Sequence, residues 1–240
     1  MSPLDPAAFL REFRSEAEGR GFRSEALADT PAGPLLAFHA PVSPEAGYLS
    51  AGIHGDEPAG PLAALELLKQ GAFDEGWTLC PALNPTGLAA GTRDNAAGTD
   101  LNRDYLRRRS AEVAAHAAWL ESRPVPGLFV SLHEDWESSG FYFYEINLGE
   151  DRPQRAAAIL GAVAPWFPPE PEASIDDHDT REPGWIYHAA EADLPDHWPE
   201  AIFLAKLGCP LSFTFETPSS ARLMDRVAAH AAAVGAAVHR

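Results

Sequence analysis

The stretch Tyr48–Gln70, YLSAGIHGDEPAGPLAALELLKQ, places a short apolar segment, a polar loop and a leucine-rich segment in direct succession. Residues 48–53 predict a short buried strand. Residues 58–70 predict a helix whose core candidates are Leu62, Leu65, Leu67 and Leu68. A strand that passes through a loop into a helix is the building unit of α/β proteins.

The same alternation continues on both sides of this stretch. Strands are expected at residues 35–39, 77–83, 127–133, 140–147 and 211–217, and helices at residues 5–19, 110–121, 153–166, 200–207 and 219–239. This order predicts an α/β fold with a mainly parallel or mixed sheet covered on both faces, and we expect one domain over residues 1–240. The long loop 84–105 is expected to be functional, and residues 168–198 are expected to be an irregular lid or specificity loop.

The composition excludes some classes of partner and leaves others open. The formal net charge of -17 disfavours nucleic-acid binding, which draws on Lys and Arg. An acidic surface is more often a device for solubility than a means of attracting cationic substrates. Cys80 and Cys209 are expected to be buried fillers rather than a disulfide. Without a signal-like or membrane-spanning stretch the chain is expected in the cytoplasm, and a homo-oligomer is left open.

The loop that follows strand 48–53 carries a possible pair of metal ligands. His54 and Glu57 stand three residues apart in SAGIHGDEPAG, flanked by Gly52 and Gly55, which permit a tight turn. An HxxE pattern alone is weak. His133 is the best candidate for a third ligand because it ends an apolar strand, where an unpartnered imidazole is costly. Two histidines and one glutamate form a known set for catalytic zinc.

The long loop concentrates polar groups that suggest an anionic ligand. Its candidates are Arg93, Asn95, Asp100, Asn102 and Arg103. A guanidinium fork suits a carboxylate, and an arginine beside a metal stabilises an oxyanion. Asp100 is a candidate to accept the free N–H of a ligating histidine. The alternative is that these residues only hold the loop together by hydrogen bonds.

Glu216 is a lone acid inside the apolar strand LSFTFET. A buried carboxylate needs a partner, and a metal-bound water is one such partner. In that position Glu216 would act as general base, taking a proton from water and passing it to a leaving amine. An internal salt bridge is the alternative.

Taken in order, HGDE (54–57), RDNAAGTDLNRDY (93–105), LHED (132–135) and FTFET (213–217) resemble the zinc metallocarboxypeptidase family. The likeness spans about residues 48–220 and is greatest to small bacterial members similar to murein peptide amidases. It implies an α/β/α fold with a mixed, twisted sheet of eight strands and one catalytic zinc ion. It also implies roles: His54, Glu57 and His133 as ligands, Arg93 for the carbonyl and oxyanion, Asn102 and Arg103 for the terminal carboxylate of the substrate, and Glu216 as base.

The chain departs from the family where the substrate is recognised. Only about 75 residues separate Glu57 from His133, so the groove is expected to be trimmed and the substrate to be a small peptide with a free C-terminal carboxylate. Tyr187 is the candidate for a tyrosine that covers the substrate, with packing as its alternative. Core packing is the favoured role for Trp136, Tyr142 and Tyr144, and a solvated loop for Asp193, Asp196 and Glu200.

Two other functions compete with a carboxypeptidase. The first is an amidohydrolase of the aspartoacylase and succinylglutamate desuccinylase type, which cleaves N-acyl amino acids. The second is a catalytically silent module that binds peptide C-termini through Arg93 and Arg103. The intact Glu216 argues against the silent module.

Overall fold

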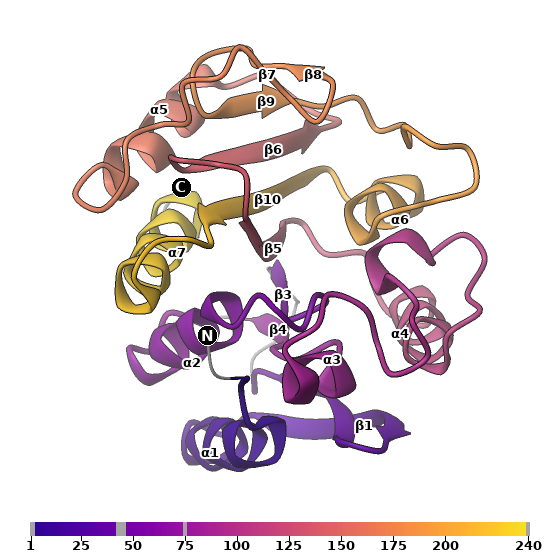
Figure 1. Cartoon of the computed structure of the whole chain (residues 1–240). Helices are drawn as coiled ribbons and strands as arrows, with labels where there is room; N and C mark the ends of the chain where they lie inside the picture. Colours follow the sequence, from indigo (N-terminus) through magenta and orange to yellow (C-terminus); the bar gives the residue numbers. More distant parts are fainter. Residues whose placement is uncertain (1–2, 42–46, 74–75, 239–240) are drawn as a thin grey trace.

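The computed structural model describes residues 3–41, 47–73 and 76–238. Within them, eight strands form one sheet in the order β1-β2-β4-β3-β5-β10-β6-β9 (Figure 1). Their bounds are β1 Arg23–Thr30, β2 Gly33–His39, β3 Gly47–Ala51, β4 Trp77–Cys80, β5 Phe129–Asp135, β6 Tyr142–Asn147, β9 Trp185–Tyr187 and β10 Leu211–Pro218. Strands β7 (Ser174–Ile175) and β8 (His178–Asp179) form a separate antiparallel pair.

The centre of the sheet is parallel and its margins are partly antiparallel. Strands β4, β3, β5 and β10 run parallel to one another, while β1, β2 and β4 pair antiparallel, as do β10 and β6. All residues of β3, and all of β5 except Asp135, are buried, as expected where helices cover both faces of a sheet. The carboxyl ends of the central strands therefore meet at one edge, where ligands gather in such folds.

Helices cover both faces of this sheet (Figure 1). They are α1 Pro6–Gly19, α2 Ala59–Lys69, α3 Pro85–Ala90, α4 Ala111–Glu121, α5 Pro153–Val163, α6 Glu200–Leu207 and α7 Leu223–Val238, with a 3-10 turn, η1, at Leu101–Arg103. Side chains of α1, α2, α5 and α7 share one buried cluster with the sheet, whereas α4 and α6 contribute to a second. This arrangement confirms the predicted α/β/α fold. No helix in the described ranges has the length and apolarity needed to span a bilayer.

The predicted elements differ from the structure mainly where the sequence has no long apolar pattern. Strand β1 was not predicted, because it is an edge strand with mostly exposed or half-buried side chains. Helix α3 and turn η1 lie inside the long loop 84–105, where the Asn84 side chain caps α3. Residues 168–198 are mostly without regular structure, as expected, although the short strands β7, β8 and β9 fall within them. The predicted end of the closing helix, His239, lies outside the described residues.

The two cysteines behave as expected. Cys80 and Cys209 are both buried and both free. Burial raises the pKa of the Cys80 thiol far above its ordinary value, and raises that of Cys209 to about 11. Both thiols therefore stay protonated at neutral pH and act as small apolar fillers.

Candidate metal centre

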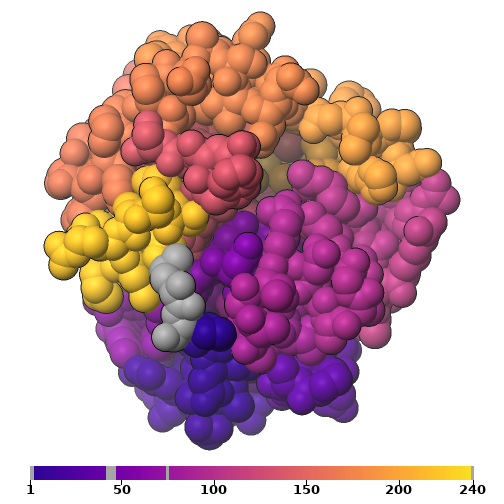
Figure 2. Space-filling model, viewed as in Figure 1, coloured from indigo at the N-terminus to yellow at the C-terminus, as the bar shows by residue number. Residues whose placement is uncertain are grey.

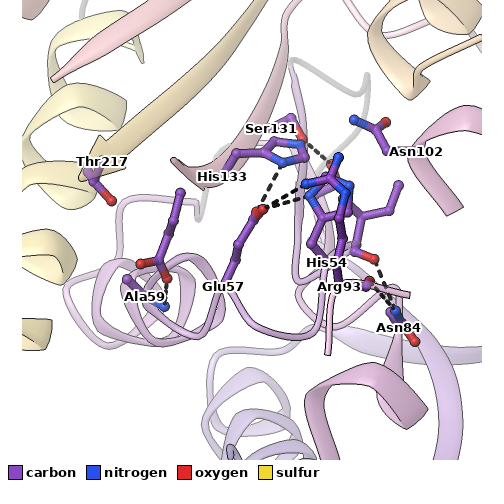
Figure 3. A network of polar contacts seen from close by, with 12 residues as sticks. His54, Glu57, Ala59, Asn84, Arg93, Asn102, Ser131, His133 and Thr217 are labelled. Carbon is purple, nitrogen blue, oxygen red and sulfur yellow. Dashed lines mark hydrogen bonds and ion pairs between the residues drawn. The ribbon is translucent and has the colours of Figure 1, made fainter. Parts of the chain in front are cut away.

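Three side chains from two chain segments converge at the carboxyl edge of the sheet (Figure 3). The Nδ1 atom of His54 lies 2.7 Å from Glu57 Oε1, and the Nδ1 atom of His133 lies 3.1 Å from Glu57 Oε2. All three residues are buried, and they offer ligand atoms within 4.8 Å of one another. The structure thus brings the three predicted metal ligands together.

Close backbone packing directs His54 and Glu57 to this point. Gly52, just after β3, has φ of 64°, a conformation that favours glycine. A Cβ on Gly55 would lie 1.8 Å from the carbonyl carbon of Gly87, so only glycine fits between the loop and α3. The loop therefore turns sharply from β3 into α2, as the flanking glycines predicted. His133 comes from β5, the strand next to β3.

The environment of these three side chains fits a divalent cation. Glu57 Oε2 is buried and accepts no hydrogen bond of normal geometry from the described residues, although it lies near His133. Burial opposes charge on Glu57, but the charges of His54 and His133 outweigh it and lower the pKa of Glu57. Burial likewise opposes charge on His54, but Glu57 and Asp100 raise the pKa of His54 to about 9. An anionic carboxylate between two imidazoles suits zinc, which would compete with protons for these atoms.

Asp100 and Arg93 lie directly beside the three candidate ligands. His54 Nε2 is 3.2 Å from Asp100 Oδ1, which directs the Nδ1 atom of the same ring toward Glu57. Arg93 Nε donates to Asp100 Oδ2 at 3.0 Å, and Arg93 Nη1 is 3.8 Å from Glu57 Oε1. Burial and the neighbouring charge of Glu57 raise the pKa of Asp56. Burial also opposes charge on Asp100, but the hydrogen bond and the charge of His54 outweigh it and lower the pKa of Asp100. Asp100 therefore stays ionised, as a partner of a ligating histidine must.

Glu216 lies one strand away from His133. In the parallel pairing of β10 with β5, Glu216 is directly opposite His133, and its half-buried side chain lines the same cavity as the three candidate ligands. Burial, followed by the charges of Glu57 and Asp135, raises the pKa of Glu216 well above its ordinary value. No salt bridge of Glu216 occurs among the described residues, so the alternative role in an ion pair has no support.

A cavity of about 490 Å³ opens in front of these residues. The space-filling view shows a hollow between the magenta loop region after β4 and the orange segments that precede α6 (Figure 2). Arg93, Asn102 and Arg103 all line the cavity, as a role in substrate binding requires. Asn102 is buried, and its Oδ1 accepts a hydrogen bond from the backbone N–H of Glu200 at 3.0 Å. Asn95 does not line the cavity and instead donates to Glu112, so for this residue the structural alternative holds.

Tyr187 lies outside this cavity, which corrects its predicted role. Its hydroxyl donates to the carbonyl oxygen of Asn147 at 3.5 Å, and the Arg181 guanidinium stacks on its ring. The physical reason is strand alternation: the next residue, His188, lines the cavity. Tyr142 and Tyr144 also line it, as does Trp136, which is 78% exposed. Core packing therefore holds for Tyr142, which is 2% exposed, but was the wrong expectation for the exposed Trp136.

Two buried acids that line the cavity, Glu134 and Glu200, were missed or misjudged from the sequence. Glu134, next to His133, accepts a hydrogen bond from the backbone N–H of Ala59 and pairs with the buried Arg226. Glu200 was expected in a solvated loop, but it is 1% exposed and accepts hydrogen bonds from Tyr48 and Ser50. The sequence contained one local indication that Glu200 is not part of a loop, namely its position after Pro199 at the start of a predicted helix. Asp193 and Asp196 are exposed, as expected.

Comparisons with known proteins relate the chain to hydrolases of the peptidase and amidase type. Residues 45–125 match the model of the succinylglutamate desuccinylase/aspartoacylase catalytic domain. The chain is 29% identical over 198 residues to murein peptide amidase A of Escherichia coli (strain K12), covering 78% of this chain and 69% of that protein. It is therefore a homologue of that amidase, which confirms the resemblance drawn from the four motifs.

Solved structures share the fold over nearly the whole chain. A crystal structure of a candidate metallopeptidase from Shewanella amazonensis SB2B superposes with a TM-score of 0.83 at 26% identity, covering 96% of this chain and 91% of that one. Murein-tripeptide amidase from Escherichia coli O157 superposes with a TM-score of 0.61 at 19% identity, covering 95% and 96%. At that identity the second likeness concerns the fold alone. The homologue and these neighbours are hydrolases of the peptidase and amidase type.

Proposed function

We propose that this chain is a zinc-dependent carboxypeptidase that hydrolyses the C-terminal peptide bond of a small peptide. One observation carries the proposal: His54, Glu57 and His133 converge on one point, with Glu216 paired across the sheet to His133. Three protein ligands leave a coordination position for water or substrate, which distinguishes catalytic zinc sites from structural ones. The homology to a murein peptide amidase supports the same class of reaction.

The proposed mechanism divides the work among residues that line one cavity. When bound by His54, Glu57 and His133, zinc would act as a Lewis acid toward water and the scissile carbonyl. Glu216 takes the proton of the attacking water and returns it to the leaving amine, and a raised pKa suits a group with both tasks. Arg93 stabilises the oxyanion by its charge, while Asp100 keeps His54 oriented.

Recognition of the C-terminus is assigned to Asn102 and Arg103. Arg103 is exposed at the cavity, and its Nη1 donates to the backbone carbonyl of the neighbouring Asn102 at 3.0 Å. A guanidinium beside an amide is suited to a carboxylate. A short peptide, including a fragment of the cell wall, fits a cavity of about 490 Å³.

A second candidate function is hydrolysis of N-acyl amino acids. It is favoured by the match of residues 45–125 to the succinylglutamate desuccinylase/aspartoacylase catalytic domain. Those residues include His54, Glu57, Arg93 and Asp100 but neither His133 nor Glu216. The match therefore covers two of the three candidate metal ligands and does not include the candidate base.

Substrate panels separate the two functions. Zinc-loaded protein is incubated with short peptides that have free or amidated C-termini, and with N-acyl amino acids. A carboxypeptidase releases the last residue only from free C-termini, whereas the alternative enzyme cleaves only the acyl compounds. In Glu216→Gln we expect turnover to fall at least about 100-fold with zinc content unchanged, because the general base is lost.

Glu137→Gln, on an exposed residue at the same end of β5, is the matched control and should retain activity. If zinc-loaded wild-type protein turns over none of these substrates but binds peptide C-termini, the silent binding module replaces the proposal. If Glu216→Gln stays as active as Glu137→Gln, the assignment of the base is wrong.

A further inference from the structure

A second group of metal-ligating side chains lines the same cavity, apart from the candidate catalytic centre. His178 Nε2 lies 3.4 Å from Asp193 Oδ1, and His188 Nε2 lies 3.5 Å from the same oxygen. These three residues offer ligand atoms that all lie within 4.8 Å of one another. The catalytic proposal uses none of them.

The cluster joins three segments that the sheet alone would not connect. His178 is in β8 and follows a turn in which Asp176 and Asp177 have positive φ angles of 49° and 63°. His188 follows β9, and its backbone N–H donates to Glu145 of β6 at 2.8 Å, so its position is tied to the sheet. Asp193 lies in the segment between β9 and α6. An ion held here would tie the β7–β8 pair and this segment to the sheet.

The hydrogen bonding of His188 leaves one ring nitrogen available. Its Nδ1 is in close contact with the carbonyl oxygen of Ala189, which only accepts hydrogen bonds. Nδ1 therefore carries a proton, so in the neutral ring the lone pair is on Nε2, which faces Asp193. A histidine that donates one N–H to a backbone carbonyl while its other nitrogen binds a metal is the usual arrangement in metal sites.

The spacing of the three groups fits metal coordination better than direct hydrogen bonding. In a tetrahedral zinc site with bonds of about 2.0–2.1 Å, neighbouring ligand atoms are separated by about 3.3–3.4 Å. The two nitrogen-to-oxygen distances are close to this value. Tyr144 also packs its ring against both imidazoles, with centroids 5.7 Å from His178 and 5.9 Å from His188, and so limits their rotation.

We propose that His178, His188 and Asp193 form a second divalent-cation site on the wall of the cavity. Two nitrogens and one carboxylate oxygen match zinc best among common cations. The side chains of His178 and His188 are 22% and 11% exposed, and that of Asp193 is 60% exposed, so the ion can enter from solvent and keep a position open to the cavity. The ion holds together the wall formed by residues 174–194. This site does not depend on which substrate the chain hydrolyses.

Metal stoichiometry tests the site in the full chain. Four proteins are compared: the wild type, His188→Gln, Asp193→Asn and the control His197→Gln. Each is equilibrated with zinc and separated from unbound metal by gel filtration. Elemental analysis then gives the number of zinc ions bound per chain. His197 lines the same cavity but is not in the cluster. We expect two ions per chain in the wild type and in His197→Gln, and one in each of the other variants.

The variant Glu57→Gln separates this site from the candidate catalytic centre. This variant should lose the ion of the catalytic centre and keep the ion of the second site. When it is loaded with cobalt, the remaining ion should give visible absorption. The double variant Glu57→Gln/His188→Gln should lack that absorption. Because Asp193 is exposed, its substitution leaves folding intact, and circular dichroism verifies this. The proposal would be overturned if His188→Gln and Asp193→Asn both retain every ion that the wild type binds.

Discussion

The carboxylate of Glu134 connects β5 to the first residue of α2, because its Oε1 accepts the backbone N–H of Ala59 at 2.7 Å. Its other oxygen pairs with Arg226 of α7, and both side chains are fully buried. Glu134 follows His133 directly, and Ala59 comes two residues after Glu57. This contact therefore sets the distance between β5, which carries His133, and the start of α2, which follows the loop that carries Glu57 (Figure 3).

Removal of this carboxylate should destabilise the fold. In Glu134→Ala the buried ion pair with Arg226 is broken, and the N–H of Ala59 loses its acceptor. Breaking a buried pair in this way costs about 3–5 kcal/mol of unfolding free energy. Urea denaturation of metal-free protein measures the loss, with the exposed Glu137→Ala as control. A loss no larger than that of Glu137→Ala would show that Glu134 does not support the site.

Asp100→Asn should weaken zinc binding while leaving the three ligands in place. The amide oxygen keeps a weaker contact with His54 Nε2 but no longer supplies a negative charge. Loss of such a carboxylate partner typically lowers metal affinity about 10- to 100-fold. Competition with a chromophoric chelator measures the change. Asp94→Asn, in the same loop, is the control, and equal affinities for the two variants would count against the assigned role of Asp100.

Gly55→Ala should be strongly destabilising although it adds one methyl group. The new Cβ would overlap the backbone of Gly87, which cannot move as a flexible side chain would. Overpacking of this kind costs about 1–3 kcal/mol or more. Gly235→Ala in α7 is the matched control, since nothing lies within 4 Å of its added Cβ. The control should instead be stabilised by about 0.5–1 kcal/mol, as expected for alanine in a helix. Thermal unfolding compares the two variants, and similar behaviour would contradict this account of the loop.

Glu200 should make the stability of the fold depend on pH. Burial raises the pKa of Glu200 to about 7, against the hydrogen bonds from Ser50 and Tyr48, which lower it. Burial lowers the pKa of the nearby His116 to about 3, so that imidazole is neutral and supplies no compensating charge. Between about pH 4.5 and pH 7 the folded chain then keeps a proton that the unfolded chain releases. Stability contributed by this group therefore falls as pH rises through that window, by on the order of 3 kcal/mol.

The difference in unfolding free energy between wild type and Glu200→Gln isolates this effect, because other groups titrate alike in both proteins. We expect the wild type to lose stability relative to the variant from pH 4.5 to pH 7, and the difference to stay constant above pH 8. Parallel curves across the whole range would show that Glu200 ionises normally.

The sequence determined the order of strands and helices and most of the candidate centre. Apolar runs predicted the central strands because burial on both faces requires them, and residue spacing around His54 and Glu57 predicted a turn with converging side chains. His133 and Glu216 were predicted because a polar side chain in an apolar strand is costly to bury unless it has a partner. Strand β1 escaped prediction because its exposed edge position imposes no apolar pattern.

Only the tertiary structure decided which distant groups meet. Strand alternation decides which side chains line the cavity: it directs His188 into the cavity and leaves Tyr187 outside it. The cluster of His178, His188 and Asp193 depends on how β8 packs beside β9, the edge strand of the sheet, and the burial of Glu200 depends on how α6 packs against the sheet. Packing of this kind depends on contacts between segments far apart along the chain. No local pattern of residues records them, so they emerge only when the chain is folded.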